Sequence, residues 1–163
     1  PRRQGRHAYY ALAGADVAAL LEKLMNFAER TGHRRTRTGP AEPALRHARV
    51  CYDHLAGDLG VALFDGLMAK RVLLRRDGEI VLSRKGEDFV ADLGVDLAGA
   101  RSARRALCKD CLDWSVRRSH LAGSLGAALL DQFHALGWAR REKDSRALRF
   151  TPPGMRGFER MLA

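Results

Sequence analysis

The chain contains the same short sequence twice, and this internal repeat limits the folds that it can adopt. Residues 54–67 read HLAGDLGVALFDGL and residues 120–133 read HLAGSLGAALLDQF. In each copy large apolar residues recur at every fourth position, a spacing that places them on one buried ridge of a helix. The two ridges are Leu55, Leu59, Leu63 and Leu67, and Leu121, Leu125, Leu129 and Phe133. We therefore expect two related helices that cover each other's apolar faces.

Each copy continues into the pattern of a hairpin and a second helix. Residues 72–83 place the turn dipeptide Asp77-Gly78 between two apolar runs, and residues 138–151 contain a longer polar turn. Ser83 and Thr151 then stand where helix N-caps are expected. The prediction is helix, two-stranded wing, helix, in two units of about residues 44–97 and 111–163 related by a pseudo-twofold axis.

Two further expectations concern the helices of the repeat. Glycine costs about 1 kcal/mol relative to alanine inside a helix, so the repeated glycines indicate close approach by a neighbouring helix. These glycines are Gly57, Gly60, Gly123 and Gly126. Residues 98–118 are predicted to bridge the two units as a helix. Its inward residues would be Leu107, Cys111, Trp114 and Val116.

The first residues have a different pattern. RHAYYAL, at residues 6–12, is a strand pattern with no partner expected upstream. From Ala15 the apolar residues follow a helical stripe that one helix cannot cover in water by itself. The stripe consists of Val17, Leu20, Leu21, Leu24, Met25 and Ala28. We predict a wing strand and a pairing helix over residues 1–31, a basic linker over 32–43 and the duplicated domain over 44–163.

The charge of the chain indicates a polyanionic partner. The formal net charge is +10, and residues 1–46 supply half of the excess with nine basic and four acidic groups. This asymmetry favours nucleic-acid contact near residue 1, with a solvated basic surface as the alternative. No apolar run is long enough to span a bilayer, and three cysteines are too few for a secreted disulfide framework. We expect a soluble, cytoplasmic protein.

The string GRHAYYALAGADVAALLEKL resembles the wing and the following helix of ArsR/SmtB-family winged-helix transcriptional repressors. The motifs CYDHLAGDLGV and CLDWSVRRSHLAGSLGAALL are similar to the long C-terminal extension of one subgroup of ArsR-like regulators. The resemblance covers effectively the whole chain. It implies a mostly α fold with short antiparallel β-hairpins, and a DNA-reading helix-turn-helix that would lie upstream of Pro1.

The resemblance also implies roles for residues of the first segment. Cationic wing side chains would lie along the backbone of a double-stranded DNA operator, where they position the protein without reading sequence. The wing residues are Arg2, Arg3, Arg6, His7 and Tyr9. The following helix would pair with its copy in a homodimer through Val17, Leu20, Leu21, Leu24 and Ala28. The zinc site that some members carry in this helix is absent, because Ala18 stands where its histidine is required beside Asp16.

Five residues are candidates for ligand or thiol sensing. Cys108 and Cys111 are three residues apart, so on the predicted helix they would share one face. Cys51, His54 and His120 lie at related places in the two repeats and can converge on this pair. Three interpretations remain open, namely buried structural cysteines, a metal site and a redox switch. A single CxxC is weak evidence for a metal, and no metal or cofactor is predicted.

The remaining histidine and aromatic residues have ordinary structural explanations. His54 and His120 are expected to bond to backbone or to a carboxylate such as Asp53 or Asp113. Tryptophans are mostly core residues, although a pocket for an apolar effector between the repeats is conceivable. Its lining would be Trp114, Trp138, Tyr52 and Phe64.

No nucleophile elbow, P-loop or Rossmann glycine pattern occurs, so no catalytic residue is predicted. The sequence favours a homodimeric ArsR-type repressor whose C-terminal domain senses a small-molecule or thiol-reactive effector, or adds a dimer contact. The alternative is a protein-interaction module whose repeats bind a partner and whose basic surface meets DNA incidentally. Neither reading involves a membrane.

Overall fold

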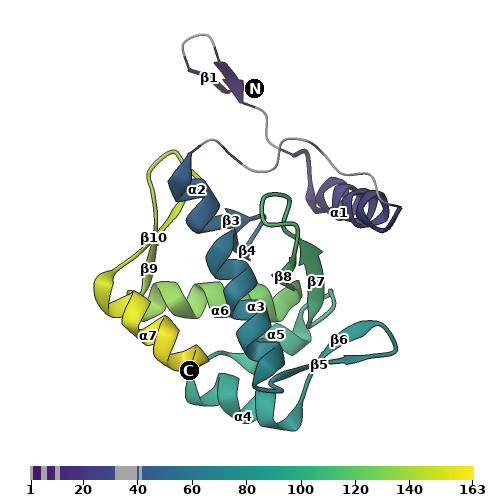
Figure 1. Cartoon of the computed structure of the whole chain (residues 1–163), viewed down its shortest axis with the longest axis vertical. Helices are drawn as coiled ribbons and strands as arrows, with labels where there is room; N and C mark the ends of the chain where they lie inside the picture. Colours follow the sequence, from purple (N-terminus) through teal and green to yellow (C-terminus); the bar gives the residue numbers. More distant parts are fainter. Residues whose placement is uncertain (1, 5–6, 10–11, 32–39, 41) are drawn as a thin grey trace. The chain divides into compact units, whose positions relative to one another are not determined.

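The computed structural model describes residues 2–4, 7–9, 12–31, 40 and 42–163. The chain divides into two compact units, Pro1–Thr36 and Arg37–Ala163. Within the described residues, helices α1 to α7 are interspersed with pairs of short strands, β1 to β10, and each pair forms an antiparallel two-stranded hairpin (Figure 1). The fold is therefore mostly α with short hairpins, as predicted. Each helix described is too short or too polar to cross a membrane.

In its described residues the first unit has one hairpin and one long helix. β1 (Arg2–Gln4) pairs with β2 (His7–Tyr9), and α1 (Ala15–Arg30) follows. The expectation that the aromatic strand has no upstream partner was wrong, because the three residues of β1 are enough to form an antiparallel pair with β2. Arg6 and most of the predicted linker lie outside the described residues, and α2 (Pro43–His47) begins at the linker's last position.

The second unit repeats one order of elements, namely hairpin, helix, hairpin, helix. The first series is β3 (Arg49–Cys51), β4 (His54–Ala56), α3 (Asp58–Ala69), β5 (Leu73–Arg76), β6 (Glu79–Leu82) and α4 (Arg84–Asp92). After α5 (Leu97–Ser102) comes β7 (Lys109–Leu112), β8 (Ser119–Ala122), α6 (Gly123–Ala135), β9 (Ala139–Arg141), β10 (Leu148–Phe150) and α7 (Pro152–Leu162). The pseudo-twofold relation between the two series stays a prediction.

The predicted turns and caps are confirmed. Asp77 and Gly78 both have left-handed φ, of 51° and 84°, as a tight hairpin turn with the right twist requires. Ser83 accepts a hydrogen bond from the backbone N–H of Gly86 at 2.9 Å, and Thr151 accepts one from Gly154 at 3.1 Å. Each hydroxyl satisfies one of the free N–H groups at the start of α4 or α7.

The predicted bridging helix over residues 98–118 was wrong. Helix α5 ends at Ser102, and residues 109–112 form β7, which pairs with β8. Of the four expected inward residues only Cys111 is fully buried, while Leu107, Trp114 and Val116 are half-buried. The ladder with β8 supplies hydrogen bonds that outweigh the local preference of this segment for a helix.

The repeated glycines act at the junction between strand and helix. Gly57 has φ 84° and Gly123 has φ 86°, so both lie in the left-handed region where the chain turns from strand into helix. At Gly60 an added Cβ would lie 2.6 Å from the carbonyl oxygen of Leu55, and Gly126 faces Leu121 in the same way. The expected approach by a neighbouring helix is confirmed at Gly57, which faces backbone carbonyls of Arg46 and His47 in α2. It was wrong for Gly60, Gly123 and Gly126, which face backbone of strands or of the segment before β7. Leu55 and Leu121 accordingly lie in strands.

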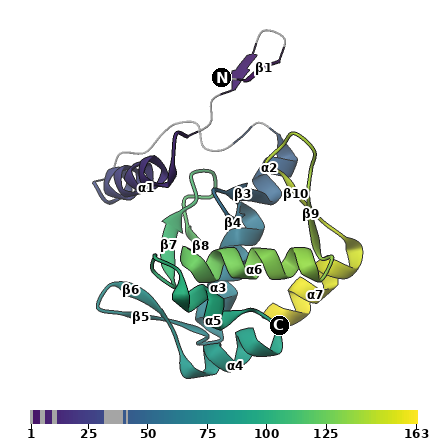
Figure 2. The same ribbon diagram turned by 180° about the vertical axis from the view of Figure 1, so that it is seen from behind.

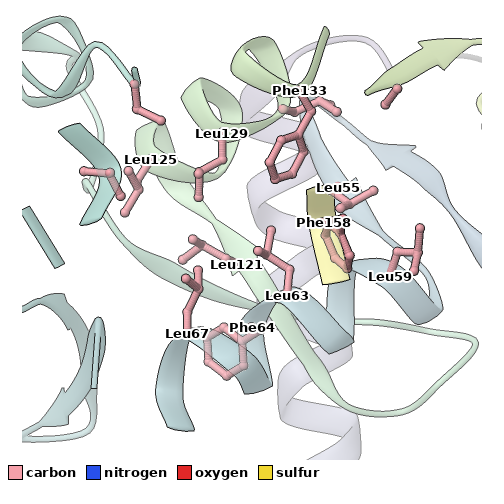
Figure 3. Close-up of a cluster of buried hydrophobic side chains, with 14 of the residues drawn as sticks. Leu55, Leu59, Leu63, Phe64, Leu67, Leu121, Leu125, Leu129, Phe133 and Phe158 are labelled. Carbon is pink, nitrogen blue, oxygen red and sulfur yellow. The ribbon is translucent and has the colours of Figure 1, made fainter. Parts of the chain in front are cut away.

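The core forms where the two series cross. α3 packs against β8 and α6 packs against β4, so each helix covers the hairpin of the other series (Figures 1 and 2). Leucines of both series meet in one buried cluster, which Phe133 and Phe158 complete (Figure 3). The expectation of mutual coverage was correct, but the surfaces that meet are helix on strand more than helix on helix.

Candidate functional site

Two cysteines and two histidines converge at the crossing of the hairpins. Cys51 is paired across β3–β4 with His54, and Cys111 is paired across β7–β8 with His120. One donor atom from each of the four side chains lies within 4.8 Å of all the others. Cys111 and both histidines are buried, and Cys51 is half-buried. We call these four residues the Cys2His2 cluster.

The same local geometry positions the cysteine–histidine pair of each hairpin. In each hairpin the cysteine stands on the first strand directly opposite the histidine on the second, so both side chains leave the same face of the ladder. β3–β4 closes over two residues, one of which, Tyr52, has φ 59°. Eight residues separate Cys111 from His120 in the second hairpin. Contact between β4 and β8 then brings the two pairs together.

Each histidine presents one ring nitrogen to the other and the second to a carboxylate. The Nε2 atoms of His54 and His120 lie 3.1 Å apart. His54 Nδ1 lies 3.1 Å from Asp53 Oδ1, whereas His120 Nδ1 lies 3.6 Å from Asp113 Oδ2 and has no hydrogen-bond partner. The predicted carboxylate partner is confirmed for His54. For His120 the expected carboxylate, Asp113, is adjacent but beyond hydrogen-bond distance.

Asp113 is held in place by several donors. The Arg49 guanidinium lies 2.8 Å from both carboxylate oxygens, and the backbone N–H of Gly57 donates to Oδ2 at 2.7 Å. Ser115 and Val116 also donate to Oδ1. Burial by itself would raise the pKa of Asp113, but these hydrogen bonds and the guanidinium hold it well below its usual range. The carboxylate is therefore a fixed negative charge beside His120.

The electrostatics of the Cys2His2 cluster favour a thiolate beside an imidazolium. A hydrogen bond from Cys111 is the largest influence on Cys51, and with the two histidines it outweighs burial and lowers the pKa of the Cys51 thiol far below its usual range. Burial disfavours the charged form of His54, but hydrogen bonds to Asp53 and Cys51 raise the pKa of His54 to about 9.

Cys108 does not join the cluster. The expectation that Cys108 and Cys111 share a helix face was wrong, because Cys111 lies in strand β7 and Cys108 lies in the bend just before that strand. Cys108 is half-buried against the core, and burial raises the pKa of its thiol to about 11. When the two repeats are aligned with one constant offset on His54 and His120, Cys51 does not align with Cys111. The two cysteines correspond only if the spacing to the histidine may differ, with two residues between Cys51 and His54 and eight between Cys111 and His120.

The four predicted pocket residues lie in different surroundings. Trp138 stacks on Phe133 with ring centroids 5.6 Å apart, and the Arg49 guanidinium lies 5.0 Å from the ring centre of Trp114. Phe64 is buried in the core, and Tyr52 is exposed. The effector pocket stays a prediction.

The residues predicted to bind DNA and to form the dimer lie in the first unit. Arg2 and Arg3 belong to β1, and His7 and Tyr9 belong to β2, while Arg6 is outside the described residues. On α1 the side chains of Leu20, Leu21 and Leu24 are exposed, and those of Val17 and Ala28 are half-buried. Phe27 is also exposed, although the predicted stripe did not include it.

Comparison with known proteins finds a related transcriptional regulator. The chain is 37% identical over 160 residues to the uncharacterized HTH-type transcriptional regulator YdfF of Bacillus subtilis (strain 168). The alignment covers 98% of this chain and 71% of YdfF. The chain belongs to the HTH-type transcriptional regulators. No protein-family model matches it, and no solved structure matches it significantly. The relation to YdfF extends over both units, so the Cys2His2 cluster lies within the region shared with this regulator.

Proposed function

We propose that the chain belongs to an ArsR-type repressor that binds a double-stranded DNA operator as a homodimer. The observation that carries this proposal is the 37% identity to an HTH-type regulator over 98% of the chain. The net charge of +10 supports a polyanionic partner. A basic hairpin followed directly by an amphipathic helix is the order of elements that the ArsR resemblance implies.

The β1–β2 hairpin is the proposed DNA-contacting wing. Arg2 and Arg3 are consecutive residues of β1, and the register places His7 opposite Gln4 and Tyr9 opposite Arg2. Cationic groups on a hairpin of this kind contact phosphates, release counterions and make affinity depend steeply on salt. Sequence would be read elsewhere, because phosphate contacts carry no sequence information.

The apolar face of α1 is the proposed dimer contact, and its occupant is α1 of a second copy. Leu20, Leu24 and Phe27 are between 54% and 58% exposed, which is unusual for large apolar side chains grouped within two helical turns. A helix that pairs with its own copy buries the same residues on both sides of a twofold axis. Removing these side chains from water favours association by roughly 25 cal/mol per Å² of apolar surface.

A matched pair of substitutions tests the dimer. Leu24→Glu introduces a charge on the exposed face of α1, and Leu136→Glu introduces the same charge on a similarly apolar surface position of the second unit, where the leucine is 43% exposed. In sedimentation equilibrium of the complete gene product, we expect wild type and L136E to be dimeric and L24E to be monomeric. A dimeric L24E protein would contradict the proposal.

DNA binding is tested with the same three proteins. Fluorescence anisotropy with the protein's own promoter fragment should give an affinity that falls steeply between low and moderate salt for wild type and L136E. Because two half-sites are bound by a dimer, L24E should bind at least 10-fold more weakly. Equal affinity for promoter and unrelated DNA, or no salt dependence, would exclude a role as a promoter-specific repressor.

A further inference from the structure

We propose that Cys51, His54, Cys111 and His120 bind one zinc ion or a chemically similar divalent transition-metal ion. The proposal concerns the second unit only and does not depend on DNA binding. Its basis is the convergence of four ligand-type side chains from β3, β4, β7 and β8 at one point.

The distances agree with a tetrahedral site. Zinc–nitrogen bonds of about 2.0–2.1 Å place two histidine ligands about 3.3 Å apart in a regular tetrahedron, and zinc–sulfur bonds of about 2.3 Å place two sulfurs about 3.8 Å apart. The Nε2 atoms of His54 and His120 lie 3.1 Å apart, and all four donor atoms lie within 4.8 Å of one another. Closure of the widest separations by up to about 1 Å completes the geometry.

The histidine rings have the orientation of metal ligands. Metal-bound histidines usually direct the second ring nitrogen to a carboxylate, which fixes the tautomer and the angle of the ring. Here both Nε2 atoms face the cluster, while Nδ1 of His54 faces Asp53 and Nδ1 of His120 faces Asp113. The same arrangement occurs in both hairpins.

One buried ring nitrogen of the Cys2His2 cluster is left without a hydrogen-bond partner. His120 is 1% exposed, and its Nδ1 makes no hydrogen bond. Two facing Nε2 atoms share one proton at most, and that hydrogen bond leaves Nδ1 of His120 without a partner whichever ring donates. A cation bound by both Nε2 atoms uses both lone pairs and favours Nδ1–H on each ring. A small rotation of His120 then brings that N–H within hydrogen-bond distance of Asp113.

The donor set selects the type of ion. Two sulfurs and two imidazole nitrogens suit zinc and similar borderline-soft ions, whereas magnesium and calcium require oxygen ligands. Two thiolates neutralise a divalent ion, and this lowers the free-energy cost of placing the charge in a buried site. Cys51 is the most accessible ligand, so its side of the cluster is the route by which the ion enters.

Four protein ligands leave no open coordination position. Such closed sites stabilise folds, whereas catalytic zinc keeps a position for water or substrate. Because each hairpin supplies one cysteine and one histidine, the ion would connect β3–β4 to β7–β8 in the core of the second unit.

Cobalt(II) is the probe for this site. Reduced, chelator-treated protein of the complete chain is titrated with CoCl2 in the absence of oxygen. We expect one Co2+ per chain, with intense visible d–d bands of tetrahedral cobalt and ultraviolet thiolate-to-cobalt charge-transfer bands. Equimolar ZnCl2 should remove the bands because zinc binds such sites more tightly than cobalt.

Two cysteine variants provide a matched comparison. Cys111→Ser removes a ligand, and Cys108→Ser removes the half-buried cysteine that lies outside the cluster. The C108S variant should keep both sets of bands. Like wild type, it should also show a higher Tm after zinc is added. The C111S variant should lose at least half of the charge-transfer intensity and bind Co2+ at least 100-fold more weakly. A His120→Gln variant, which keeps all three cysteines, should lose tetrahedral d–d intensity and thereby covers the case in which C111S does not fold.

The proposal is overturned by either of two results. One is a folded, reduced wild-type chain, judged by circular dichroism, that gives no charge-transfer bands with Co2+. The other is a spectrum that C108S weakens as much as C111S does, because the metal would then be bound by surface or non-native thiols.

Discussion

Arg49 and Asp113 form a buried ion pair in which Nη2 of the guanidinium lies 2.8 Å from both carboxylate oxygens. Arg49 also donates to the carbonyl oxygen of Leu45 and to Ser115. The pair joins β3 of the first series to the loop that follows β7, next to the Cys2His2 cluster. Both side chains are almost completely buried, so solvent does not screen their charges.

Loss of the guanidinium should destabilise the second unit strongly. In Arg49→Met the Asp113 carboxylate stays buried without its cation, a change that typically costs about 3–5 kcal/mol. Arg149→Ala is the control, because Arg149 pairs with Glu142 at 2.9 Å on the surface and such pairs contribute less than about 1 kcal/mol. Urea denaturation measures the free energy of unfolding of both variants. A loss in R49M no larger than that in R149A would contradict the importance of the buried pair.

Alanine at Gly57 should be much more harmful than alanine at Gly78. Both glycines have φ 84°, where a Cβ atom costs about 1–2 kcal/mol. An added Cβ at Gly57 would also lie 2.5 Å from the carbonyl oxygen of Arg46, whereas nothing lies within 4 Å at Gly78. We expect Gly57→Ala to lose about 3 kcal/mol or more and Gly78→Ala only the backbone cost. Equal urea midpoints would show that the contact with Arg46 relaxes freely.

Asp53 should set the metal affinity of His54. Its carboxylate lies 3.1 Å from His54 Nδ1 and also pairs with Arg105. Removal of such a carboxylate typically weakens metal binding about 10–100-fold, so we expect this loss for Asp53→Ala in competition titrations of Co2+ against a chelator. Arg105→Ala keeps the carboxylate and should change the affinity less than about 3-fold. If both variants bind equally, orientation by Asp53 is unimportant.

Cys108 should be protected from alkylation at neutral pH. Burial raises the pKa of its thiol from 9.0 to about 11, and only the thiolate reacts. Between pH 7 and 8 the folded protein should therefore react with iodoacetamide at Cys108 about 100-fold more slowly than urea-unfolded protein, since each pKa unit is a tenfold change in thiolate. Peptide mass spectrometry measures the rates. Similar rates in both states would contradict the raised pKa.

The same shift fixes the sign of a pH effect on stability. Between about pH 9 and 11 the unfolded thiol ionises while the folded one stays protonated, so stability falls as pH rises through this window. The slope should be smaller in Cys108→Ser than in wild type, measured by urea denaturation across that range.

Features set by a few neighbouring residues could be predicted from the sequence. Asp77-Gly78 determines a tight hairpin by its own backbone preferences, and Ser83 and Thr151 satisfy helix N–H groups only three residues away. No distant contact is needed for either effect. The repeated leucines likewise predicted a core that both repeats share, because apolar ridges of this kind must be buried wherever they lie.

Features set by contacts between distant segments could not be predicted from the sequence. β3 has three residues and β7 has four, too few for a recognisable alternation, and the turn at Tyr52 lacks a glycine. The segment around Cys111 is a strand only because it pairs with β8, which lies beyond a loop, and its own residues do not indicate that partner. The convergence of Cys51 with Cys111 depends on that pairing and on the packing of β4 against β8, so the sequence identified the residues but grouped Cys108 with them wrongly.

Each of the helices α3 and α6 packs against a strand of the other series, and this arrangement also determines when the second unit can fold. α3 has no complete surface to cover until β8 exists, and Phe133 and Phe158, which fill the cluster around it, come still later in the chain. Contacts over such separations form slowly because the long loop must close first. During synthesis the leucines of α3 therefore lack part of their cover until the segment up to Phe158 has been made, and exposed apolar surface of this kind favours aggregation.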